Sequence, residues 1–212
     1  VCTFSYVSYL AQRYWAAAAR GLWMAALGGL YSSTATTVVL AHQARANPAL
    51  KPQADAGITL ATAIMYLRIE AVIAIFNQSL ARLLLPPLLG LAAAGFALCA
   101  LQYWWLDRTA QDVERPAMPP ANSANPLQFG PAAIFAVLFV AISLASNFAT
   151  SQFGTAGIYA LAAIIGFSDI DPFVLNLAQG GAGGGVAEAA LAAAILIAAS
   201  SNNVLKLSLI HI

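Results

Sequence analysis

The stretch TAGIYALAAIIGFSDIDPFVLNLA, residues 155–178, decides the fold class of this chain. It is about as long as the roughly 20 apolar residues that an α-helix needs to cross the hydrocarbon layer of a bilayer. Inside it, Asp169 and Asp171 lie two residues apart, and Pro172 follows directly. Proline lacks a backbone donor and clashes with the preceding turn, so the pattern predicts a membrane-embedded helix that is broken in its interior.

The rest of the chain has the same apolar character. Of its 212 residues, 61% are hydrophobic and 8% are charged, whereas a soluble domain carries about 25% charged residues. We therefore predict an all-α fold, a polytopic transmembrane helix bundle of about six full spans with a partial span at the N-terminal end. The expected spans are 21–44, 54–79, 83–106, 128–150, 155–178 and 186–206, and the partial span is 1–12.

One polar connection, residues 107–127, divides the apolar segments. It is rich in proline and mixed in charge, which favours an aqueous linker loop within a single membrane domain of residues 1–206. Residues 207–212 read LSLIHI, the conceptual translation of a sequencing adapter, and we expect them to be a non-native tail. Because the chain starts at Val1 inside an apolar run, we also expect native sequence upstream.

Two stretches of the chain resemble each other weakly. GLYSSTATTVVLAHQ from Gly29 and GFSDIDPFVLNLAQ from Gly166 match Ser32 with Asp169 and Thr34 with Asp171. This predicts repeat-like units at about 21–79 and 155–206, each with a broken helix, and internal duplication of this kind is common in transporters. Chance similarity between apolar helices is the rival explanation. The spacing favours parallel repeats unless one segment is re-entrant.

The second break carries the strongest chemical signal. Two residues apart on an intact helix, Asp169 and Asp171 would diverge by about 200°, so a shared ligand requires an unwound backbone. Asp171 is a good N-cap, with Pro172 at the first helical position, whereas capping leaves Asp169 unexplained. With Ser168 and free carbonyls, the two carboxylates would make an oxygen-rich site for protons or a small metal cation.

The first break carries hydroxyl groups instead of carboxylates. Ser32, Ser33, Thr34 and Thr36 follow a glycine pair, and we expect them to line the same cavity as Asp169, beside the positive end of a half-helix. Binding of an anionic substrate at this half-site is therefore an alternative to binding of a cation. The alternative is structural, since serine and threonine in membrane helices often bond to their own backbone or join neighbouring helices.

Further polar residues in apolar spans are candidates for gating or counter-charge roles: Arg68, Glu70, Asn202, Asn203 and Lys206. A guanidinium is costly in lipid, so we expect Arg68 to pair with a carboxylate of another helix, first of all Asp169. A static buried ion pair is favoured equally with a gating or substrate role for Arg68.

The sequence gives no support for several other functions. It has no catalytic triad, no cysteine–histidine cluster and no dinucleotide fingerprint, so we expect neither an enzyme nor a cofactor, apart from a bound metal cation. Nine basic and eight acidic residues are scattered singly, which argues against nucleic-acid binding.

Five landmarks give the chain a family resemblance. It resembles the uncharacterised bacterial membrane domain of unknown function 4010, which follows an MgtC/SapB-type domain in many proteins. The landmarks are GGLYSSTATTVVLAHQARANP (Gly28–Pro48), AIMYLRIE (Ala63–Glu70), NPLQFGPA (Asn125–Ala132), GTAGIYALAAIIGFSDIDPFVLNLA (Gly154–Ala178) and SNNVLK (Ser201–Lys206).

The resemblance implies a multi-pass protein of the bacterial inner membrane, with an upstream MgtC/SapB-like domain as partner and an association with magnesium homeostasis. The expected function is a transporter or channel-like module for a small ion, either a divalent cation such as magnesium or a proton-coupled substrate. The alternative is a non-transporting membrane scaffold or regulator. The other expected partners of this chain are the lipid bilayer and a second copy of the chain in a homo-oligomer.

Overall fold

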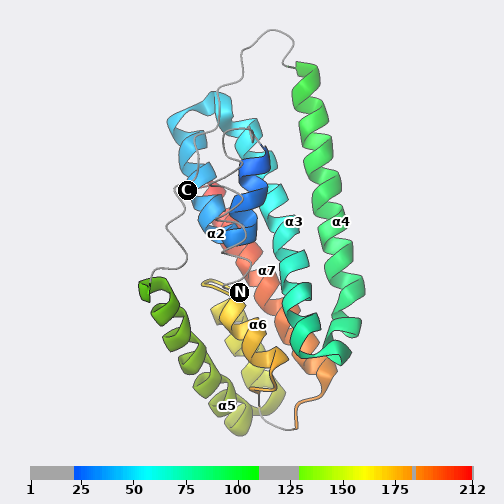
Figure 1. Cartoon of the computed structure of the whole chain (residues 1–212), viewed down its shortest axis with the longest axis vertical. Coiled ribbons are helices and arrows are strands. Elements are labelled where there is room, and N and C mark those ends of the chain that lie inside the picture. Colours follow the sequence, from blue (N-terminus) through cyan, green and yellow to red (C-terminus); the bar gives the residue numbers. More distant parts are fainter. Residues whose placement is uncertain (1–21, 110–128, 183–184, 212) are drawn as a thin grey trace. The chain divides into compact units, whose positions relative to one another are not determined.

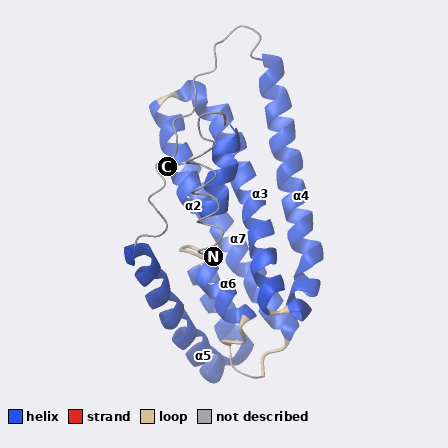
Figure 2. Cartoon of the chain, viewed as in Figure 1, coloured by secondary structure: helices blue, strands red, loops and turns tan. Residues whose placement is uncertain are grey.

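The computed structural model describes residues 22–109, 129–182 and 185–211, and every regular element in these ranges is helical (Figure 2). This agrees with the predicted all-α fold. The elements appear in chain order in Figure 1. They are α2 (Leu22–Ala46), the short 3-10 helix η1 (Pro48–Leu50), α3 (Lys51–Phe76), α4 (Gln78–Thr109), α5 (Phe129–Ile165), α6 (Asp171–Ala178) and α7 (Glu188–His211).

Four of the described helical segments are long and apolar enough to cross a membrane. They are Pro48–Phe76, Gln78–Trp105, Ala133–Ile165 and Glu188–Ile210. The chain is thus a multi-pass membrane protein by helix length and composition, while the predicted count of six spans is not confirmed. The partial span 1–12 and most of the linker lie outside the described residues.

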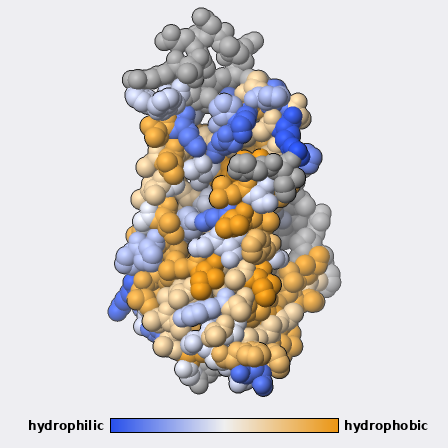
Figure 3. All heavy atoms as spheres, turned by 180° about the vertical axis from the view of Figure 1, so that it is seen from behind, coloured by the Kyte–Doolittle hydropathy of each residue, from blue (hydrophilic) through white to orange (hydrophobic). Residues whose placement is uncertain are grey.

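The described surface is unusually apolar. Large hydrophobic side chains are exposed along α4 and α5, for example Leu98, Ile134 and Leu144, and apolar residues cover much of the face shown in Figure 3. Tyr103 and Trp105 are exposed near the end of α4, as expected for aromatic anchors at the headgroup layer. Lipid rather than water is the solvent that suits this surface.

Asparagine side chains cap the N-terminal ends of α4 and η1. Asn77 is the only residue between α3 and α4, and its side-chain oxygen accepts a hydrogen bond from the Leu80 amide at 3.0 Å. Asn47 caps η1 in the same way, since its side chain accepts from the Ala49 amide. An asparagine oxygen satisfies one of the donors that the first turn of a helix leaves unpaired.

The chain divides into two compact units. Unit 1 comprises Val1–Arg68, Leu89–Leu127 and Leu209–Ile212. Its core contains a buried cluster of Ala25, Leu40, Ala54 and Ile58, so α2 packs against the beginning of α3. A Cβ placed on Gly95 would lie 2.8 Å from the Ala63 Cβ, so the backbones of α4 and α3 approach each other closely at this glycine.

Unit 2 comprises Ile69–Leu88 and Gln128–Ser208. Within it, α5 bends sharply at Gly154, whose φ of 59° and ψ of −139° lie in a region that favours glycine. A Cβ on Gly157 would meet the carbonyl oxygen of Ala149, although eight residues of straight helix span about 12 Å. The chain therefore reverses at Gly154, and α6 then packs back against α5.

Candidate functional site

The first candidate region is a reversal inside α2. Ser32 has φ of −158° and ψ of 112°, which interrupts the helix, and a Cβ on Gly28 would lie 2.5 Å from the Thr36 hydroxyl oxygen. Because residues eight apart in a straight helix are separated by about 12 Å, residues 22–31 and 33–46 form two half-helices that fold back on each other. We call this helical hairpin 1, with its tip at Tyr31 and Ser32.

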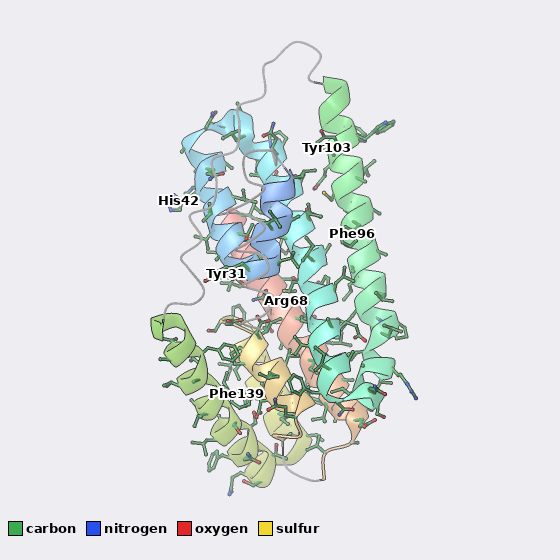
Figure 4. All side chains as sticks on the ribbon, in the orientation of Figure 1. Tyr31, His42, Arg68, Phe96, Tyr103 and Phe139 are labelled. Carbon is green, nitrogen blue, oxygen red and sulfur yellow. The ribbon has the colours of Figure 1, made fainter. Side chains whose placement is uncertain are left out.

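Both broken ends at this tip have hydrogen-bond partners. The Ser32 hydroxyl oxygen accepts from the Ala35 amide at 3.3 Å, which caps the second half-helix. Arg68 on α3 donates through Nη1 to the carbonyl oxygens of Leu30 at 3.2 Å and Tyr31 at 2.9 Å (Figure 4). A guanidinium thus satisfies carbonyls that the end of the first half-helix leaves without helical partners, where the helix dipole favours a cation.

The threonines that follow the tip are bonded to their own helix. Thr36 and Thr37 donate to the carbonyl oxygens of Ser32 and Ser33, at 2.9 and 2.8 Å. Ser33, Thr36 and Thr37 are buried, whereas Thr34 is half-buried. These bonds match the structural alternative for Thr36, although each hydroxyl oxygen keeps acceptor capacity for a ligand.

The second candidate region lies between α5 and α6. α5 ends at Ile165 and α6 begins at Asp171, so the helix is interrupted where Pro172 predicted a break. Residues 155–178 are therefore two antiparallel half-helices rather than one span, and Figure 1 shows α6 running back beside the end of α5. We call this helical hairpin 2, with its tip at residues 166–170. Two tight turn bonds shape the tip, from the Phe167 and Ser168 amides to the Ile164 and Ile165 carbonyls.

The capping roles of the two carboxylates differ from the prediction. Asp171 lies in the first turn of α6, and Ile170 occupies the N-cap position without a side-chain bond. The capping acceptor is Asp169 instead, whose Oδ1 accepts from the Asp171 amide at 3.2 Å. Asp169 therefore has the structural role that the sequence assigned to Asp171. The difference arises because an Asp or Asn side chain can accept a hydrogen bond from the backbone amide two residues later, as in an Asx turn. Asp169 therefore caps α6 from a position before the N-cap residue.

The surroundings of the two carboxylates also differ. Ser168 and Asp169 are exposed at the tip, whereas Asp171 is 8% exposed and Pro172 is buried behind it. Both acidic groups lie at the N-terminal end of α6, where the helix dipole stabilises negative charge. The Asp169 carboxylate and the Ser168 hydroxyl thus lie within a short stretch of chain, and oxygen groups of this kind are the ligands that small cations prefer.

Asn202 on α7 holds the tip of hairpin 2. Its Nδ2 donates to the carbonyl oxygens of Gly166 at 3.2 Å and Ser168 at 3.4 Å, and Asn202 is 1% exposed. A Cβ on Gly166 would meet the Ala198 carbonyl oxygen, so only glycine allows the tip to approach α7 this closely. Lys206 is buried one turn further along α7, and Asn203 is half-buried beside it.

Sequence reasoning found the polar residues but not what they hold. Arg68 and Asn202, the candidates for gating or counter-charge roles, both donate to carbonyls at hairpin tips, and the gating and counter-charge roles stay predictions. The available signal was a polar residue on the helix face that also carries a small residue, Ala61 or Ala198. Glu70 is buried on α3 in unit 2. The pairing of Arg68 with Asp169 and the shared cavity stay predictions.

The described residues contain no group of three or more histidine, cysteine, aspartate or glutamate side chains that could together hold a metal ion. A cation at hairpin 2 would therefore have to combine Asp169 or Asp171 with backbone oxygens and water.

The family model described as "Domain of unknown function (DUF4010)" matches residues 1–212. No curated protein and no solved structure matches the chain.

Proposed function

This chain belongs to the family of the domain of unknown function 4010, and we propose that it is a transporter or channel-like module that carries a small ion across a membrane. The proposal includes residence in a bacterial inner membrane and an upstream MgtC/SapB-like domain in the full-length protein. The substrate that the polar groups favour at hairpin 2 is a cation, either a proton or a small divalent ion.

One observation carries the proposal: the tip of hairpin 2 exposes a carboxylate inside an apolar segment. Ser168 and Asp169 are exposed together with the neighbouring Phe167, while Ile170 and Phe173 on the other side are buried. Non-helical backbone at membrane depth is tolerated only where it is buried in protein or lines a water-filled cavity. Because an ionised carboxylate in lipid costs several kcal/mol, an exposed Asp169 favours a water-filled path.

The test is ion flux in reconstituted vesicles, with Asp169→Asn as the key variant. Asparagine keeps the shape of the side chain and an oxygen that can still accept from the Asp171 amide, so the cap is preserved while the charge is lost. We expect flux of magnesium or protons to fall by about tenfold or more, since each tenfold costs about 1.4 kcal/mol of barrier.

The matched control is Asp55→Asn. Asp55 forms an exposed ion pair with Lys51 at 3.7 Å near the start of α3, so this variant removes the same charge from a residue that belongs to neither hairpin. Its flux should stay near the wild-type value. Equal flux in the wild type and Asp169→Asn at every pH would refute the role of this carboxylate.

A second function, a non-transporting membrane scaffold or regulator, is favoured by the bonds at hairpin 1. There the Arg68 guanidinium and the Thr36 and Thr37 hydroxyls donate to backbone carbonyls, as a purely structural core requires. A scaffold predicts that wild-type protein gives no flux above empty vesicles for any small ion, while remaining folded. That result would replace the transporter proposal with this one.

A further inference from the structure

The two hairpin tips are held by the same device. In unit 1 one nitrogen of Arg68 donates to two adjacent carbonyls, those of Leu30 and Tyr31. In unit 2 one nitrogen of Asn202 donates to two nearby carbonyls, those of Gly166 and Ser168. Each donor comes from the long helix that follows its own hairpin in the chain, α3 in the first case and α7 in the second.

Both pairs of carbonyls belong to backbone that a break in the helix leaves without helical partners. Leu30 and Tyr31 end the first half-helix of hairpin 1, whose last four carbonyls have no intrahelical donor. Gly166 and Ser168 lie in the non-helical tip beyond the end of α5. In an apolar surrounding each unsatisfied group costs free energy, so a side chain must reach the tip from elsewhere. Arg68 and Asn202, at 6% and 1% exposure, supply these donors from within the protein.

The same helix face that carries each donor also receives the glycine of its hairpin. A Cβ on Gly29 would lie 2.7 Å from the Ala61 Cα, and Arg68 follows Ala61 by two turns. A Cβ on Gly166 would meet the Ala198 carbonyl oxygen, and Asn202 follows Ala198 by about one turn. The glycine thus sets the approach of the hairpin to the long helix, and the donor fixes the tip.

We propose that Arg68 and Asn202 are positioning residues that hold the hairpin tips in the geometry used for ion transport. For hairpin 2 the consequence is specific. Asn202 holds the carbonyls on both sides of Phe167, one of them directly before Asp169, so it fixes the direction in which Ser168 and Asp169 are presented. This inference rests on the proposed function for its effect on flux, but the ordering of the tip is independent of it.

The test uses full-length chain in vesicles with a nitroxide spin label at an exposed tip residue, Phe167→Cys, in a background of Cys2→Ser and Cys99→Ala. The variant is Asn202→Ala, and the control is Ser200→Ala on the same helix, whose hydroxyl donates only to the Leu196 carbonyl of α7 itself. We expect faster label motion in Asn202→Ala and no change in Ser200→Ala. Asn202→Gln, which keeps the amide donor, should restore part of the order.

Flux measured on the same samples separates the two claims. A displaced tip that still transports should raise KM by about tenfold with a smaller change in maximal rate, as expected when ligand positioning is lost. Label motion in Asn202→Ala equal to wild type would overturn the inference, whether or not ions move. Increased label motion with no wild-type flux would uphold the positioning role and refute the proposed function.

A folding failure of Asn202→Ala does not block the test, because Asn202→Asp serves as the second variant. It keeps the size of the side chain but places an acceptor against two carbonyl oxygens, so it too should release the tip. A tip that stays ordered in Asn202→Asp would count against the inference.

Discussion

Hairpins 1 and 2 share a plan but differ in charge. Each has a reversed broken helix, a tip glycine packed on the following long helix, and a donor from that helix to the tip carbonyls. Hairpin 1 has a cationic donor, Arg68, and only hydroxyl groups after its tip, whereas hairpin 2 has a neutral donor, Asn202, and two carboxylates. The two hairpins therefore share the way in which their tip carbonyls are held and differ in the charged groups beside those carbonyls.

The largest effect on stability should come from removing the cationic donor. Arg68→Met keeps the length of the side chain but leaves the Leu30 and Tyr31 carbonyls without this donor, which should cost about 3 kcal/mol at roughly 1–3 kcal/mol per buried group. Denaturant unfolding in detergent measures the loss. Thr59→Val on the same helix is the control, because Thr59 donates only to the Asp55 carbonyl of α3. Equal stabilities of the two variants would show that Arg68 does not hold tip 1.

A smaller effect is expected at the tip glycines, where it also tests how alike the hairpins are. Gly29→Ala and Gly166→Ala each drive a methyl group into backbone atoms, of Ala61 and Ala198 respectively, and overpacking of this kind costs about 1–3 kcal/mol. The control is Gly90→Ala on α4, where no atom lies within 4 Å of the new methyl group. In thermal unfolding, the control should have a higher midpoint temperature than both variants. A tolerant Gly166→Ala beside an intolerant Gly29→Ala would break the comparison.

The cap at tip 2 should contribute less. Asp169→Ala removes the acceptor for the Asp171 amide and should lower the free energy of unfolding by about 1 kcal/mol, as for other lost N-caps. Asp169→Asn should leave that free energy almost unchanged while abolishing the charge. Chemical unfolding of the two variants side by side checks this. If both destabilise equally, the charge rather than the cap stabilises α6.

The smallest effect is expected from Thr36→Val. The hydroxyl bonds the Ser32 carbonyl within its own hairpin, and side-chain hydrogen bonds in membrane proteins average about 0.6 kcal/mol. A change below this value in unfolding free energy, with unaltered flux, would assign Thr36 to structure alone. A clear loss of flux at normal stability would restore its predicted place in the ion site.

The sequence predicted the positions of the breaks better than the path of the chain. Pro172 and the acidic pair located tip 2, because proline and capping residues act through local backbone chemistry. Hydropathy then misjudged residues 155–178 as one span. It measures how much apolar chain is present, and a hairpin of two half-helices contains as much as a single crossing helix. The reversal at Gly154 lies at the expected boundary between the spans 128–150 and 155–178.

The donors at the tips could not be assigned from sequence for a different reason. Arg68 lies 37 residues from Tyr31, and Asn202 lies 36 from Gly166, so their contacts depend on tertiary packing that no local pattern encodes. What the sequence did supply was the cost of a polar group in an apolar segment, which marked both residues as meaningful. The free-energy cost of a polar side chain in an apolar segment identifies such a residue. Only the packing of the helices shows which backbone group that side chain satisfies.

Cysteine accessibility is the sharpest test of whether the tip of hairpin 2 faces water within the membrane. Ser168→Cys in a background of Cys2→Ser and Cys99→Ala is treated with a membrane-impermeant maleimide, added to sealed vesicles from either side. The control is Leu144→Cys, which is exposed on the apolar surface of α5 and should face lipid. We expect labelling of Ser168→Cys and none of Leu144→Cys. Absence of labelling at Ser168→Cys from both sides, in folded protein, would contradict a water-facing tip.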